Sequence, residues 1–165
     1  MAETADRKKV NLYVAITPRG PRKSTGAYVW LLECIRDDGT ADPRTLSKKG
    51  SRENVCDKTL AAIAATEGLQ HIKRECDVQL ILDPEYLTEM LSNTLYQWVT
   101  KWEQNGWKTS SGSDVKDADI WKEFKAVSMS KNAVFAEAGI ENTYRSWMQT
   151  ELSHVSMSKN AEDKK

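Results

Sequence analysis

The chain has 165 residues, which is enough for one globular domain that buries its core without disulfides or a structural metal. Its 24 basic residues balance 24 acidic residues, so the net charge excludes a general attraction to polyanions, and any nucleic-acid binding must use a local patch. Three widely separated cysteines and two histidines argue against a disulfide framework and a zinc site. The polar start and the absence of a long apolar run predict a cytoplasmic protein without a membrane segment.

The first third of the chain has strand character. After a flexible segment over residues 1–9, we expect strands over 10–16 and 26–35 and a weaker strand over 44–49, because β-branched and aromatic residues dominate the first two. The run T-P-R-G-P-R ends the first strand, and R-D-D-G-T supplies the turn that leads to the third.

The middle of the chain predicts a helix, a strand and a second helix. The first helix, over 54–73, has apolar residues near helical spacing. These are Leu60, Ile63, Ala64, Leu69 and Ile72. The apolar run V-Q-L-I-L-D predicts a buried strand that ends at Asp83, and the helix over 86–102 then ends near Asn105 and Gly106.

The last third predicts a short helix over 120–127 capped by an aspartate, a strand over 133–138 and a helix over 142–152. Residues Tyr144, Trp147, Met148 and Leu152 of that helix should face inward. The element order describes an α/β domain over 10–153, a mixed sheet with helices on its faces. Residues 154–165, which contain the second copy of the repeat V-S-M-S-K-N-A, are expected to form a loosely ordered tail.

Two motifs carry a family resemblance. The stretch Y-Q-W-V-T-K-W-E-Q-N-G-W-K-T, followed by V-K-D-A-D-I-W-K-E-F, resembles the tryptophan-rich handle of bacterial type I ribonuclease H and the helix after it. The C-terminal T-Y-R-S-W-M is similar to the end of a shorter branch of that superfamily. The resemblance implies a ribonuclease-H-like mixed five-stranded sheet with helices on both faces.

The resemblance also implies a reaction that this chain lacks the residues to perform. Family members cleave the RNA of an RNA–DNA hybrid with two magnesium ions held by four acidic side chains, and hard cations need such oxygen ligands. Here Asp83 matches one acid, but Ala15 stands at the first position. The second position falls on Ala61, or on Lys58 in a shifted register.

The fourth acid has one candidate, Glu141, and the histidine expected near it is absent. We therefore predict no tight magnesium site and little or no hydrolysis. A different helix register would bring Asp57, Glu53 or Glu67 to the centre. In that case the protein would be an active, magnesium-dependent ribonuclease H with displaced acids.

Binding is the function that such a domain retains. By resemblance to the handle, and from cations placed beside flat rings, the expected nucleic-acid contacts are Trp98, Lys101, Trp102, Trp107 and Lys108. A basic loop adds Arg19, Arg22 and Lys23. Trp98 and Trp102, at i and i+4 of a helix, equally fit a buried core, so Trp107 after Gly106 is the tryptophan that we expect to be exposed. The basic loop equally fits a loop that is only solvated.

Two functions compete on this scaffold. The first is an inactive module, a pseudoenzyme, that binds an RNA–DNA hybrid or another duplex. The second is a protein-binding inhibitor or decoy, for example an anti-defence protein of a phage or mobile element, which neutral charge and the many tryptophans also fit.

Overall fold

The computed structural model describes residues 8–17, 24–73, 76–136, 140 and 142–163, without the side chains of Lys8, Ser24 and residues 156–163. The strands are β1 (Lys8–Ile16), β2 (Ser24–Ile35), β3 (Ala41–Val55), β4 (Cys76–Asp83) and β5 (Ala133–Phe135). The helices are α2 (Asp57–Gln70), α3 (Tyr86–Asn93), α4 (Val99–Gln104), α5 (Ala118–Ser130) and α6 (Arg145–Asp163). A π-helical turn, η1 (Thr94–Trp98), joins α3 to α4.

The strands of the described chain form one mixed sheet in the order β3-β2-β1-β4-β5. β1 and β2 are antiparallel, as are β2 and β3, whereas β4 runs parallel to both β1 and β5. The predicted α/β class and mixed five-stranded sheet are confirmed.

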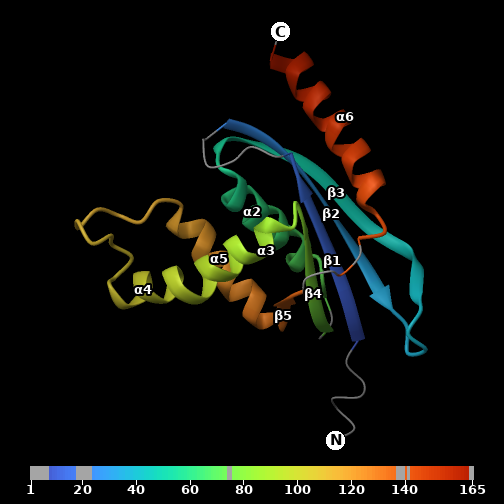
Figure 1. Cartoon of the computed structure of the whole chain (residues 1–165), viewed down its shortest axis with the longest axis horizontal. Coiled ribbons are helices and arrows are strands. Elements are labelled where there is room, and N and C mark those ends of the chain that lie inside the picture. The colour runs from blue at the N-terminus through green and yellow to red at the C-terminus, as the bar shows by residue number, and fades with distance from the viewer. Residues whose placement is uncertain (1–7, 18–23, 74–75, 137–139, 141, 164–165) are drawn as a thin grey trace, which may run out of the picture.

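Helices cover both faces of the sheet, as predicted. Alternate residues of β1 point to opposite sides, so Leu12 and Val14 join one apolar cluster while Tyr13 and Ala15 join another. Figure 1 shows α2, α3 and α5 on one side of the sheet and α6 (red) on the other. The end of β4 therefore lies between two helical layers.

Helix α2 packs closely against the centre of the sheet. Its predicted apolar face is buried at Leu60, Ile63, Ala64, Leu69 and Ile72, the last just beyond the helix end. Gly68 permits this approach, because a Cβ atom there would lie 2.7 Å from Cδ1 of Leu12 and 3.3 Å from Cδ2 of Trp30. A glycine inside a helix is otherwise unfavourable, so close packing explains it.

Two elements are longer than the sequence predicted. β3 extends to Val55 as an edge strand with mostly exposed side chains, and such a strand lacks the alternation that identifies a half-buried one. α6 begins at Arg145 and continues beyond Leu152 to Asp163, so the backbone of the expected tail is helical there. No proline or glycine interrupts that segment.

Two local expectations were wrong. Trp147 is 39% exposed, whereas Met148 and Leu152 are buried, because this i, i+4 pair defines the inner face of α6 and Trp147 lies beside it. Helix α5 begins at Ala118 after Asp117, which has a left-handed φ of 58° and makes no side-chain capping hydrogen bond.

No helix in the part of the chain that the structure describes has the length and apolar character needed to span a bilayer.

The packing of Gly68 predicts the sign of a substitution. Helix propensity alone would make Gly68→Ala stabilising by about 1 kcal/mol. Because the added methyl group would press on Leu12 and Trp30, we expect the free energy of unfolding in urea to fall by about 1–2 kcal/mol instead. A rise in that free energy would show that α2 does not pack this closely.

Candidate functional site

Asp83 ends β4 beside Ala15 of β1. The parallel register pairs these two residues directly. Asp83 is 5% exposed and Ala15 is fully buried. The first acidic position inferred from the resemblance thus lies next to Asp83, and the methyl group there offers no ligand.

Two side chains of α6 engage the carboxylate of Asp83. Nη2 of Arg145 donates to Oδ1 at 2.7 Å, and Nε2 of Gln149 donates to Oδ2 at 2.8 Å. Because they are separated by four residues, both donors lie on one face of the helix. The hydrogen bond and charge of Asp83 raise the pKa of Arg145, so the guanidinium remains a cation. Sequence reasoning missed both residues.

The residues considered for the second acidic position lie elsewhere. Ala61 is fully buried in the apolar cluster between α2 and the sheet. The ammonium group of Lys58 lies 6.0 Å from the ring centroid of Trp121. Neither side chain is a carboxylate, so neither supplies a second acidic ligand beside Asp83.

The acids of the alternative register already have partners or lie on another element. Asp57 accepts hydrogen bonds from the Tyr86 hydroxyl at 2.8 Å and from its neighbour's backbone N–H. Glu67 accepts from Tyr28 and Trp30 at 3.0 and 2.7 Å. Glu53 is exposed on β3. Glu141 lies outside the described residues.

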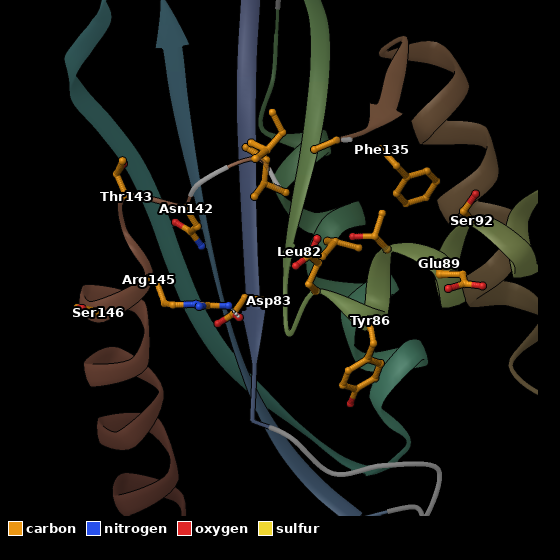
Figure 2. Close-up of a pocket in the computed structure, with 15 residues that line it drawn as sticks. Leu82, Asp83, Tyr86, Glu89, Ser92, Phe135, Asn142, Thr143, Arg145 and Ser146 are labelled. Atoms are coloured by element: carbon orange, nitrogen blue, oxygen red, sulfur yellow. Dashed lines mark hydrogen bonds and ion pairs between the residues drawn. The ribbon is translucent and has the colours of Figure 1, made fainter. Parts of the chain in front are cut away.

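A pocket of about 1040 Å³ opens beside Asp83. Figure 2 shows Arg145 reaching Asp83 from one wall, while Tyr86 and Glu89 belong to the opposite wall. Asn142, Thr143 and Ser146 complete the wall near the start of α6. Among the described residues, the charged groups of the lining are Asp83, Glu85, Glu89 and Arg145.

The tryptophans of the handle-like segment form a row of contacting rings. The centroids of Trp98 and Trp102 are 6.2 Å apart, and those of Trp102 and Trp107 are 6.0 Å apart. Trp98 is 49% exposed, whereas Trp102 and Trp107 are partly buried against the main core. The expectation that Trp107 is the exposed ring was wrong, because Gly106 turns the chain back and places Trp107 on Trp102.

The two predicted handle lysines have different surroundings. Nζ of Lys101 lies 5.2 Å from the ring centroid of Trp98, so a cation and an exposed ring share one surface. Lys108 is ion-paired with Asp114. The basic-loop residues Arg19, Arg22 and Lys23 lie outside the described residues.

Comparison with known proteins identifies the family. The model of the family described as RNase H matches residues 39–142. The chain belongs to the ribonuclease H family. One relative is the ribonuclease H of Pseudomonas fluorescens, which is 35% identical over 45% of this chain and 47% of that protein. Another is the ribonuclease H of Francisella philomiragia, which is 31% identical over 53% of this chain and 55% of that protein. The chain thus spans about half the length of the curated relatives that it matches.

Solved structures share the ribonuclease H fold at low identity. The structure of LC9-RNase H1, described as a type 1 RNase H with the type 2 active-site motif, has a TM-score of 0.68, 17% identity, and coverage of 92% of this chain and 74% of that one. A foamy viral protease–reverse transcriptase in complex with dsDNA has a TM-score of 0.62, 12% identity, and coverage of 93% and 97%.

The described residues do not fit the paired magnesium ions of a ribonuclease H. Hard cations need several oxygen ligands, and Asp83 has an alanine beside it and donors on both of its oxygens. Within the described part of the chain, no three His, Cys, Asp or Glu side chains come close enough to hold a metal.

A buried carboxylate fixes the start of α6 in this ribonuclease H domain. Glu33 of β2 is 6% exposed, and its oxygens accept hydrogen bonds from Asn11 and Tyr13 at 3.0 Å and from Tyr144 at 2.5 Å. Tyr144 precedes Arg145, so the bond to Glu33 holds the guanidinium near Asp83. Burial, followed by the bond to Glu33, raises the pKa of Tyr144 to about 12.

Removing the Tyr144 hydroxyl should therefore loosen α6. We expect Tyr144→Phe to lower the free energy of unfolding by about 1–3 kcal/mol, because a buried carboxylate loses a donor. Tyr96→Phe is the control, since that ring is 60% exposed, and should change it by less than about 0.5 kcal/mol. Equal effects of the two substitutions would contradict the anchoring role.

The raised pKa of Tyr144 also predicts a pH dependence. In the unfolded chain a tyrosine ionises near pH 10, whereas folded Tyr144 keeps its proton to about pH 12. Its contribution to stability is complete below pH 10 and is lost as the pH rises to 12. Urea unfolding over this range should show a shallower decline for Tyr144→Phe than for the wild type.

Proposed function

We propose that this ribonuclease H-family domain binds nucleic acid without hydrolysing it. The observation that carries the proposal is the pairing of Ala15 with Asp83 while Arg145 and Gln149 occupy both oxygens of that carboxylate. Two-metal hydrolysis requires ions that stabilise the attacking and leaving oxygens together. One engaged carboxylate does not supply their ligands.

The handle surface supports binding. Trp98 offers half of its ring to solvent with the ammonium group of Lys101 beside it. Flat rings stack on bases or sugars, and cations contact phosphates. Arg19, Arg22 and Lys23 stay in the proposal as a second basic contact, and Trp102, Trp107 and Lys108 as support of the handle.

An RNA–DNA hybrid is the first ligand that we assign to this domain. Two fold neighbours are foamy viral protease–reverse transcriptases described as complexes with dsDNA and with an RNA/DNA hybrid, the latter with a TM-score of 0.61 and 10% identity. Those titles concern the viral proteins, and for this chain the ligand is our proposal. We place its action in the cytoplasm, in keeping with three free cysteines.

A second candidate function is protein binding as an inhibitor or decoy. Its support is a set of large apolar side chains exposed on the described surface, among them Tyr96 at 60%, Met129 at 67% and Val134 at 57%. Aromatic and methionine side chains anchor protein interfaces. A stoichiometric protein partner recovered by pull-down, together with no affinity for nucleic acid at low salt, would favour this function.

The absence of hydrolysis is tested on a labelled RNA–DNA hybrid. With Mg²⁺ or Mn²⁺, we expect the wild type and Asp83→Asn to give the same background, because no metal centre exists to disrupt. A bona fide ribonuclease H serves as the positive control. Wild-type cleavage that disappears in Asp83→Asn would establish the remaining alternative, an active enzyme with displaced acids.

Binding is tested by titrating the hybrid into the protein at several salt concentrations. Trp98→Ala should weaken binding by about tenfold, since a stacked base contributes about 1–3 kcal/mol. Lys101→Gln should reduce the slope of the logarithm of the binding constant against the logarithm of the salt concentration by about one unit. Trp147→Ala is the matched control, because that ring is exposed on α6. No binding by the wild type at low salt would reject the proposed function.

A further inference from the structure

We infer that Arg145 supplies, in place of a divalent cation, the positive charge that Asp83 requires, and that it closes this position to metal ions. The inference deepens the proposed loss of hydrolysis and rests on it. The absence of metal binding then has a cause beyond the missing carboxylates. Asp83 uses its oxygens to attach α6 to the end of β4.

The surroundings of Asp83 require a counter-charge. Its side chain is 7% exposed, and a carboxylate buried to this degree is stable only when it is paired and hydrogen-bonded. Arg145 provides the charge at 2.7 Å, and Gln149 satisfies the second oxygen at 2.8 Å. Within this geometry the carboxylate is fully paired without a metal.

The same contacts oppose a metal ion. Magnesium requires near-octahedral oxygen ligands at about 2.0–2.1 Å, and it would have to take the oxygen that Arg145 now contacts. The guanidinium would then repel the ion across a short distance. Gln149 turns its amide nitrogen, a hydrogen-bond donor, toward Asp83. In this orientation it offers no oxygen ligand to a metal ion at that carboxylate.

Arg145 is held in place by the helix that carries it. The preceding residue, Tyr144, donates to buried Glu33 at 2.5 Å, and the following turns bury Met148 and Leu152 against the sheet. The ion pair is therefore set by packing. It differs from the pair of Lys49 with Glu151, which joins the same helix to β3, because the side chain of Glu151 is 22% exposed whereas that of Asp83 is 7% exposed.

The first test measures metal binding directly. Mn²⁺ binding, followed by electron paramagnetic resonance, is compared for wild type, Ala15→Asp and the double variant Ala15→Asp/Arg145→Ala. We expect binding at millimolar Mn²⁺ only in the double variant, which pairs two carboxylates and lacks the guanidinium. Its unfolding midpoint should rise by several degrees on adding Mn²⁺ and fall again with a chelator.

Two results would overturn the inference. One is Mn²⁺ binding by the wild type, and the other is equal binding by Ala15→Asp with and without Arg145. Cleavage of the hybrid by the wild type would instead reject the proposed function. Mn²⁺ binding by the wild type without cleavage would reject only the role of Arg145, so the two failures are distinguishable.

A second measurement covers the case in which the double variant does not fold. Thermal unfolding is compared for Arg145→Gln, Asp83→Asn and Asp83→Asn/Arg145→Gln, with Lys49→Gln as the control, an ion pair of α6 whose carboxylate is less buried. Arg145→Gln should lower the midpoint by several degrees, and adding Asp83→Asn should recover most of that loss. A decrease no larger than that of Lys49→Gln, or additive losses in the double variant, would contradict the inference.

Discussion

The attachment of α6 to the end of β4 is the interaction on which the rest of this structure depends. Asp83 is buried, so its charge has to be met by the element that covers it. α6 meets it with Arg145 and Gln149 and in doing so covers the sheet face that carries Tyr13 and Ala15. The same contacts that complete the fold occupy the oxygens that a metal would use.

Polar contacts with three strands place α6 along its length. Tyr144 reaches Glu33 of β2, Arg145 reaches Asp83 of β4, and Glu151 reaches Lys49 of β3. Met148 and Leu152 fill the space between these contacts with apolar packing. Directional contacts at several strands fix both the position and the rotation of the helix, which apolar packing alone specifies less well.

The sequence predicted those parts of the fold whose pattern is local. Leu60, Ile63 and Leu69 show the buried face of α2 by their spacing alone, and the apolar run ending at Asp83 identifies β4. It did not predict the partners of Asp83, because Arg145 is 62 residues away and an exposed arginine on a helix has no distinctive pattern. It misjudged Trp107, because that residue has a φ of 62° and its contact depends on a turn rather than on helical spacing.

The proposed replacement of a metal by a guanidinium would change what the position of Asp83 can contribute to binding. Two divalent ions would bring four positive charges to a carboxylate cluster and draw a phosphodiester into it. Here one guanidinium is paired with Asp83, and the other charged groups of the described pocket lining, Glu85 and Glu89, are acidic. Such a lining attracts phosphate weakly, so the affinity for nucleic acid has to come from surfaces outside it. Among the described residues, Trp98 with Lys101 and Trp107 with Lys122 each pair a ring with a cation, and Trp98 is the more exposed ring. Trp98 and Lys101 are separated from Asp83 in the chain by helix α3. In the proposed function the binding surface and Asp83 lie on different elements, so the loss of metal ligands need not weaken binding.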